Sequence, residues 1–342
     1  MQLSFEQIKE IATGAVDSHI EDGMLQLKRF SPEQMELYRV SNEMFYKKTF
    51  ALSGMKLLFK TNSENLFMKF KTEYAGSRKY FSIDIFVNGK PIDYIDNFSD
   101  VEIPQMYATM DFPLGDFSKN IYLGDGEKTV CVYLPWSVKT LFEEISVDDN
   151  SFVEAIKPEK KLLVFGDSIT QGYDALRPSN RYITKIADLL CAEEYNKAIG
   201  GEKFFPALAE LKDSFNPDYI LVSYGSNDWR HRDMETFKVK CKGFFENLAK
   251  NYPNTKIFAV TPIWRKDITE EKPFGDFETV DLLIRNAVKD CKNISVISGF
   301  DFVPKDEKYF ADLRLHPNDE GFKHYAENLY NAIRKAELCE SE

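Results

Sequence analysis

The chain has 342 residues, of which 43% are hydrophobic, 14% aromatic and 29% charged. This length favours two domains over one, and the composition is typical of a folded globular protein and excludes a largely disordered one. The formal net charge of −11 at pH 7 argues against a nucleic-acid-binding surface, because such a surface needs clustered lysine and arginine.

The N-terminal segment, residues 1–23, contains early acidic residues and no continuous apolar stretch, so it does not resemble a secretory signal. No later apolar run is long enough to span a membrane, and no membrane partner is expected. Segments 4–16 and 31–40 are predicted to be short helices or irregular, with Ser31 as a helix N-cap before an acidic first turn.

The segment from Gly54 to Val147 consists of short extended runs separated by turn residues. The run SIDIFV alternates apolar and polar residues, and Asn88-Gly89 is a typical tight hairpin turn. These features predict antiparallel hairpins that form a β-sandwich. We expect this domain, residues 1–157, to end near Lys157-Pro158.

From Lys160 onward, near-continuous apolar runs alternate with amphipathic stretches. This alternation is what a parallel sheet covered by helices on both faces requires, so residues 158–342 are predicted to form a doubly wound α/β domain. The apolar runs are 161–166, 194–200, 218–225, 256–262 and 294–298. In such folds the ligand site lies beyond the carboxyl ends of the strands.

Ser168 directly follows the first of these strands and lies between Gly166 and Gly172, which permit a sharp turn. A serine hydroxyl becomes a nucleophile only when a base accepts its proton. His316 lies between the last strand and the last helix, on the same sheet edge as Ser168, and is therefore the best-placed base. The other histidines are His19, His231 and His324.

Ester hydrolysis also needs hydrogen-bond donors aimed at the developing oxyanion. Asn227 follows the third strand and can supply a side-chain amide, and a glycine after the second strand can present a bare backbone N–H. Taken singly these are ordinary turn residues. Their occurrence with Ser168 and His316 at successive strand ends is a much rarer coincidence.

These residues resemble the four signature blocks of the SGNH (GDSL-type) hydrolase family, which are Gly-Asp-Ser at 166–168, the second-strand glycine, Gly-x-Asn-Asp at 225–228 and His-Pro at 316–317. The resemblance covers the chain from about Lys160 onward and implies a flavodoxin-like parallel sheet. It also implies Ser168 as nucleophile, His316 as general base, and an oxyanion hole built from Ser168 N–H, Gly201 N–H and the Asn227 side chain.

The position of the acid departs from the family pattern. An aspartate usually lies three positions before the histidine, but that position holds Leu313, and the acid is Asp312, one residue earlier. Asp312 reaches His316 if the loop bulges; otherwise a backbone carbonyl orients the histidine. We predict Asp312 as the third member of a triad.

Trp229 and Trp264 follow the third and fourth strands and are predicted to narrow an acyl pocket or stack on a sugar ring, with packing against the sandwich as the alternative. The sandwich before the catalytic domain resembles the layout of carbohydrate esterase family 2. The expected function is therefore hydrolysis of a short acyl ester, acetyl foremost, on a small-molecule or oligosaccharide substrate. No metal and no organic cofactor is expected, because the oxyanion hole and the base supply the electrostatics, and the absence of a Gly-rich phosphate loop agrees with this expectation.

Two other functions remain open. A thioesterase or lysophospholipase would use the same centre but would require an apolar groove for a long chain. A carbohydrate-binding protein with a vestigial centre would explain the displaced acid.

The five cysteines form neither a CxxC pair nor a Cys/His cluster at zinc spacing, so reduced thiols and a cytoplasmic location are expected. The cysteines are Cys131, Cys191, Cys241, Cys291 and Cys339.

Overall fold

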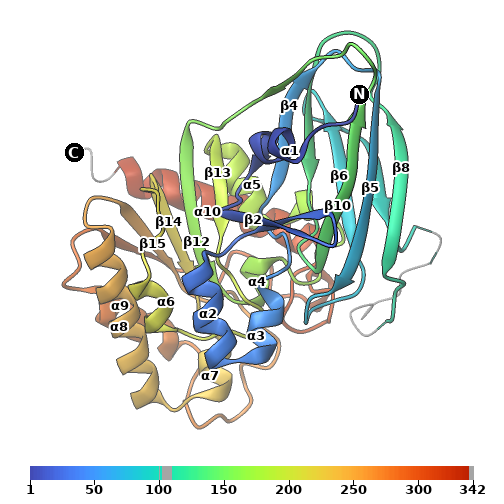
Figure 1. The fold of residues 1–342 in the computed structure, drawn as a ribbon. Helices are drawn as coiled ribbons and strands as arrows, with labels where there is room; N and C mark the ends of the chain where they lie inside the picture. Colours follow the sequence, from blue (N-terminus) through green and yellow to red (C-terminus); the bar gives the residue numbers. More distant parts are fainter. Residues whose placement is uncertain (100, 102–109, 339–342) are drawn as a thin grey trace.

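The computed structural model describes residues 1–99, 101 and 110–338, so Cys339 lies outside the described residues. Two antiparallel sheets form a β-sandwich, and a parallel sheet with helices on both faces lies beside it (Figure 1). This arrangement confirms the predicted sandwich followed by a flavodoxin-like α/β fold. In the described residues, no helix is long and apolar enough to cross a membrane.

The first sandwich sheet has the strand order β1-β4-β9-β6-β7, and β11 also pairs with β4. Its strands are β1 (Ala12–Thr13), β4 (Lys56–Thr61), β6 (Ser82–Val87), β7 (Lys90–Asp96), β9 (Lys128–Tyr133) and β11 (Val153–Ala155). Asn88 and Gly89 join β6 to β7 with φ angles of 48° and 78°, which confirms the predicted hairpin turn.

The second sandwich sheet has the order β2-β3-β10-β5-β8. Its strands are β2 (Asp17–Glu21), β3 (Met24–Lys28), β5 (Asn65–Tyr74), β8 (Gly115–Tyr122) and β10 (Val138–Val147). Sequence reasoning did not predict β2 and β3, because neither is a run of β-branched residues. They form a hairpin because Asp22 and Gly23 both adopt positive φ angles, and β3 then pairs with β10.

The parallel sheet has the order β13-β12-β14-β15-β16, which is the flavodoxin-like order in which the first strand lies between the second and third. Its strands are β12 (Lys160–Gly166), β13 (Ala192–Asn196), β14 (Tyr219–Ser223), β15 (Lys256–Val260) and β16 (Ile294–Ile297). Each strand overlaps one of the predicted apolar runs, although β13 begins at Ala192 and ends at Asn196, before the end of the predicted run 194–200. The carboxyl ends of the strands lie along one edge of the sheet.

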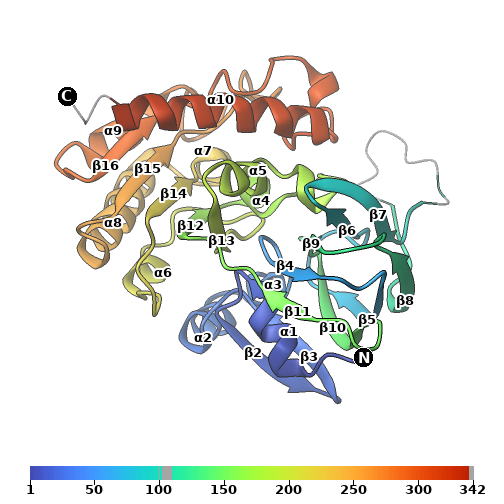
Figure 2. The same ribbon diagram turned by 90° about the horizontal axis from the view of Figure 1, so that it is seen from above.

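Successive residues of each parallel strand belong to two different hydrophobic cores. Leu163 and Phe165 face the core beneath α6, α8 and α9, whereas Leu162 and Val164 face the core beneath α5 and α10. Figure 2 shows α8 and α10 on opposite sides of the sheet. These helices are α5 (Tyr182–Leu189), α6 (Pro206–Glu210), α8 (Met234–Asn251), α9 (Thr279–Val288) and α10 (Asp319–Leu338).

Helices from the N-terminal part of the chain also pack on the α/β half. These helices are α1 (Phe5–Ile11), α2 (Pro32–Ser41) and α3 (Glu43–Lys48), and α2 lies beside α6 in Figures 1 and 2. The Ser31 capping box begins α2 as predicted, and Tyr38 of this helix belongs to the core of the parallel sheet. The domain boundary at residues 157 and 158 remains a prediction, because α2 from the N-terminal part packs in the core of the α/β half.

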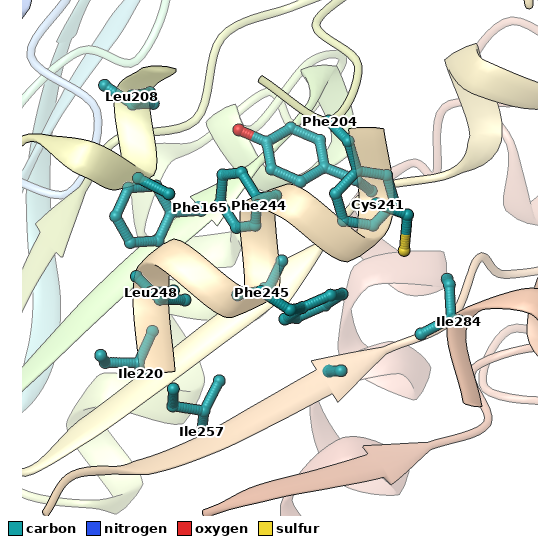
Figure 3. Packing of buried hydrophobic residues seen from close by; sticks show 14 of the residues in the cluster. Phe165, Phe204, Leu208, Ile220, Cys241, Phe244, Phe245, Leu248, Ile257 and Ile284 are labelled. Atoms are coloured by element: carbon teal, nitrogen blue, oxygen red, sulfur yellow. The ribbon is translucent and has the colours of Figure 1, made fainter. Parts of the chain in front are cut away.

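Aromatic side chains fill the core under α8 (Figure 3). Phe244 is fully buried, and its ring makes edge-to-face contacts with Phe165 and Phe204. Such contacts stabilise the core beyond the area that they bury. Val239 lies on the same helix but is 70% exposed.

Phe244→Ala is expected to lower the free energy of unfolding by about 3–5 kcal/mol, because the truncation leaves a cavity in a close-packed core. Chemical denaturation followed by circular dichroism measures this change. Val239→Ala serves as the control and is expected to stay within about 0.5 kcal/mol of the wild type, since no packing is lost. Equal losses in the two variants would contradict the assignment of the core.

Candidate active site

The nucleophile turn begins where β12 ends at Gly166. Asp167 caps the short helix α4 (Ser168–Gln171) by accepting a hydrogen bond from the Ile169 N–H at 3.0 Å. Gly172 then ends α4 with a φ of 113°, a conformation that favours glycine. Ser168 is therefore the first residue of a tight strand-to-helix turn, and 6% of its surface is exposed.

Ser168 and His316 are in hydrogen-bond contact although 148 positions separate them in the sequence. The Ser168 Oγ and the His316 Nε2 lie 2.9 Å apart, and the His316 Nδ1 lies 2.9 Å from the Asp312 Oδ2. This chain of contacts has the connectivity of a nucleophile, a base and an orienting acid.

The loop before His316 does bulge, which brings the displaced acid within reach. Leu313 has a φ of 56°, in the left-handed region, so the chain reverses directly after Asp312. The Asp312 Oδ1 accepts backbone hydrogen bonds from Arg314, Leu315 and His316 at 3.0, 2.7 and 3.0 Å. One oxygen of the carboxylate holds the loop, and the other is free to face the imidazole.

The predicted oxyanion donors are connected through shared partners. Asn227 lies on helix α7 (Ser226–His231), and its Nδ2 donates to the Asp167 Oδ2 at 3.3 Å and to the Glu202 carbonyl at 3.1 Å. Those partners are the neighbours of Ser168 and Gly201 in the sequence. Gly201 has a φ of 87° and is exposed.

Gly200 uses its own N–H to donate to the Gln171 Oε1 at 2.7 Å. A side chain at Gly200 would also collide with the Tyr173 ring. Because the Gly200 N–H is already used in this internal hydrogen bond, Gly201 is favoured over Gly200 as the donor to a substrate. The role of Gly201 in the oxyanion hole remains a prediction.

The two tryptophans occupy different environments, and the structure corrects the expectation for one of them. Trp229 is fully buried, donates its Nε1–H to the Gly275 carbonyl at 2.8 Å and packs edge-to-face on Phe277. It is a core residue of the α/β half and cannot stack on a sugar. Trp264 is partly exposed and contacts Phe310, near the start of the histidine loop.

Sequence reasoning missed a second carboxylate beside the histidine. The Asp174 Oδ2 lies 3.2 Å from the His316 Nδ1, and Asp174 has no exposed side-chain surface. The Tyr173 ring lies 5.6 Å from the imidazole, centroid to centroid. Both residues directly follow the nucleophile turn, but nothing in their sequence distinguishes them from ordinary loop residues.

Asp174, Asp312 and His316 place one oxygen or nitrogen atom each within 4.8 Å of one another, a spacing that could hold a metal ion. Their donors are, however, already directed at one another, and the guanidinium of Arg78 faces Asp174. A metal cation next to the Arg78 guanidinium would be unfavourable. The two carboxylates therefore suit the imidazole of His316 better than a metal ion.

The two carboxylates determine the protonation of the base. Burial alone would lower the pKa of His316, but hydrogen bonds and charges from Asp174 and Asp312 outweigh it and raise the pKa to about 9. Burial would raise the pKa of Asp312, yet His316 and the loop N–H groups hold it well below its ordinary value. A protonated histidine would thus be stabilised by both acids.

The fold and the contacts at the strand ends define a serine hydrolase centre. Residues 164–324 match the model of the GDSL-like lipase/acylhydrolase family, a family of carboxylic-ester hydrolases. No curated protein sequence matches the chain.

Several solved structures share the fold over nearly the whole chain. The salicylyl-acyltransferase SsfX3 from a tetracycline biosynthetic pathway is 18% identical, with a TM-score of 0.76, and the match covers 96% of this chain and 94% of that one. A family two carbohydrate esterase from Cellvibrio japonicus is 16% identical, with a TM-score of 0.67 and coverages of 98% and 97%. A family two carbohydrate esterase from Clostridium thermocellum, in complex with cellohexaose, is 15% identical, with a TM-score of 0.64 and coverages of 84% and 93%.

Asn227→Ala is expected to lower kcat by about 10²–10³ with little change in KM, because an oxyanion donor acts mainly in the transition state. Steady-state kinetics on an activated ester measures both constants. Asn251→Ala is the control, since the Asn251 side-chain amide likewise donates two hydrogen bonds, here to the backbone carbonyls of Ala209 and Glu210, away from Ser168. A decrease in kcat of less than tenfold for Asn227→Ala would contradict the assignment of Asn227 to the oxyanion hole.

Proposed function

We propose that the protein is a serine esterase that hydrolyses a short acyl ester, acetyl foremost, on a hydroxyl of a carbohydrate. The observation that carries the proposal is the continuous contact from Ser168 through His316 to Asp312. A serine so placed is activated for attack on a carbonyl carbon.

The geometry supports an acyl-enzyme mechanism. His316 accepts the Ser168 proton at Nε2 as the Oγ bonds to the ester carbonyl carbon, and the resulting oxyanion is bound by the Ser168 N–H, the Gly201 N–H and Asn227. The imidazolium then gives that proton to the departing alkoxide as the carbon–oxygen bond breaks. Water, deprotonated by His316, hydrolyses the acyl-enzyme and regenerates Ser168.

Charged side chains beside the predicted oxyanion glycine and beside Tyr173 favour a small acyl group. Lys48, from α3, donates to the Gly200 carbonyl at 2.6 Å, and Arg78 is 5.1 Å from the Tyr173 ring centroid. A long acyl chain needs an apolar groove, and charged side chains along such a groove would have to lose water to accommodate the chain.

The carbohydrate acceptor is supported by the similar structures. Two of them are family two carbohydrate esterases, and one was solved with cellohexaose. Acyl transfer to another hydroxyl is a second candidate, because it uses the same acyl-enzyme and the chain shares its fold with an acyltransferase.

The main argument for a carbohydrate-binding protein with an inactive hydrolase centre no longer holds. It arose from the displaced acid, and Asp312 does contact His316. Reaction of Ser168 with a fluorophosphonate separates the two functions, since only an activated serine reacts quickly.

Ser168→Ala is expected to lower kcat for p-nitrophenyl acetate by about a thousandfold or more, since the nucleophile is removed and only binding and the oxyanion donors remain. Ser298→Ala, at the end of β16 and hydrogen-bonded to Asp281 and Arg285, is the matched control. Circular dichroism verifies folding of both variants. Full activity in Ser168→Ala would contradict the proposed nucleophile.

The wild type is expected to cleave p-nitrophenyl acetate with a higher kcat/KM than the butyrate or octanoate ester, because the charged side chains of Lys48 and Arg78 lie beside Gly200 and Tyr173 and disfavour a long apolar chain there. Initial rates measured with the three esters give this order. Acetylated oligosaccharides are then tested as substrates. A maximum at octanoate would favour a thioesterase or lysophospholipase instead.

A further inference from the structure

One salt bridge joins the sandwich to the catalytic centre. Arg78 lies in the loop between β5 and β6, and its guanidinium contacts the Asp174 carboxylate through two hydrogen bonds, at 2.7 Å from Nε and 3.1 Å from Nη2. The Tyr80 hydroxyl donates to the same carboxylate at 3.2 Å. A paired, planar contact of this kind fixes the orientation of a carboxylate as well as neutralising it.

The other face of this carboxylate is directed at the catalytic base. The His316 Nδ1 lies 3.2 Å from Asp174 and 2.9 Å from Asp312, so two carboxylates converge on one ring nitrogen. Burial would raise the pKa of Asp174, but His316 and Arg78 hold it below its ordinary value, and the side chain is ionised. The nitrogen therefore faces negative charge on two sides.

The backbone holds Asp174 in a constrained position. Its φ is 71°, in the left-handed region, and it lies two residues after the glycine that ends α4. The same turn thus carries the nucleophile at its start and this carboxylate at its end. Asparagine tolerates the left-handed region about as well as aspartate, which makes Asp174→Asn a conservative variant.

We propose that Asp174 is a second positioning carboxylate for His316, and that Arg78 of the sandwich holds it in place. The inference rests on the proposed esterase function and extends it, because the sandwich then completes the catalytic centre. Asp174 acts through the imidazole and touches no substrate. It keeps the proton on Nδ1 and stabilises the imidazolium that forms when Ser168 attacks.

The charged and titratable groups that surround His316 come from several segments. Within the described part of the chain they include Asp167 at the end of β12, Tyr173 and Asp174 after α4, Asp312 on the histidine loop, and Arg78 on the sandwich, which acts through Asp174. Asp174→Asn removes the negative charge of Asp174 and leaves Arg78 without this carboxylate partner, and both changes lower the pKa of His316.

The first test is the pH dependence of Ser168 labelling by a fluorophosphonate, which needs no knowledge of the substrate. The base must be neutral, so the wild-type rate is expected to rise with pH through a midpoint near the pKa of His316, about 9. In Asp174→Asn the midpoint is expected to fall by about one pH unit or more, because a nearby opposite charge is lost.

Asp96→Asn is the matched control. Asp96 is also a buried carboxylate paired with an arginine across the boundary between the two halves, at 2.6 Å from Arg177, and it makes no contact with His316. Its labelling midpoint is expected to match the wild type. An unmoved midpoint in Asp174→Asn, or equal shifts in both variants, would overturn the inference, whereas absent labelling of the wild type at every pH would overturn the proposed function.

The second test measures the coupling between the two acids. In a triad with one aspartate, replacement by asparagine costs about 10⁴ in kcat because the histidine adopts the wrong tautomer. Here Asp312→Asn alone is expected to cost at least tenfold less than that, since Asp174 still holds Nδ1–H. Adding Asp174→Asn is expected to bring the loss to about the full 10⁴.

Arg78→Met is expected to lower kcat by a larger factor in the Asp312→Asn background than in the wild type, because Asp174 then has to orient His316 unaided. Arg78→Lys keeps the charge but loses the paired contact, and is expected to restore part of the activity. A full loss in Asp312→Asn alone, or identical factors for Arg78→Met in both backgrounds, would show that Asp174 has no positioning role.

Discussion

The catalytic centre depends on the placement of one imidazole ring. His316 has to present a bare Nε2 to Ser168, and this requires that its other nitrogen carry the proton. Two carboxylates face that nitrogen, at 2.9 and 3.2 Å, and hold the ring in this tautomer. The remaining parts of the fold can be understood by how they bring these groups together.

The parallel sheet brings distant parts of the chain to one edge. β12 is the first strand of the α/β half, and the loop with His316 precedes its last helix, α10; each delivers its functional residue at the carboxyl end of the sheet. The turn after β12 carries Ser168 and then Asp174 within a few residues, so nucleophile and carboxylate share one rigid segment. The cores on both faces of the sheet fix this segment in place.

The N-terminal half contributes to the same centre. Its β5–β6 loop supplies Arg78, and Trp136 donates its Nε1–H to the Ala175 carbonyl at 2.9 Å, beside the Asp174 turn. Lys48 of α3 contacts the glycine loop of the predicted oxyanion hole. The N-terminal half therefore makes direct contacts with the residues of the catalytic centre.

The parallel sheet and the proximity of Ser168 to His316 could be predicted from the sequence, because apolar strands and the residues that follow them are local signals. The position of Asp312 was predictable only as one of two alternatives, since it depends on the left-handed conformation of Leu313, which no local pattern encodes. Trp229 was misplaced because a residue after a strand can turn inward as easily as outward. Asp174 was missed because its partner, Arg78, is almost a hundred residues away.

The most direct measurement is a ¹⁵N-histidine NMR titration of the protein, with His316→Gln used to assign its signal among the four histidines. The structure predicts that His316 carries its proton on Nδ1 at high pH and becomes doubly protonated with a pKa near 9, well above the ordinary histidine value. A neutral ring protonated on Nε2, or a pKa at or below the ordinary value, would contradict the central role of the two carboxylates.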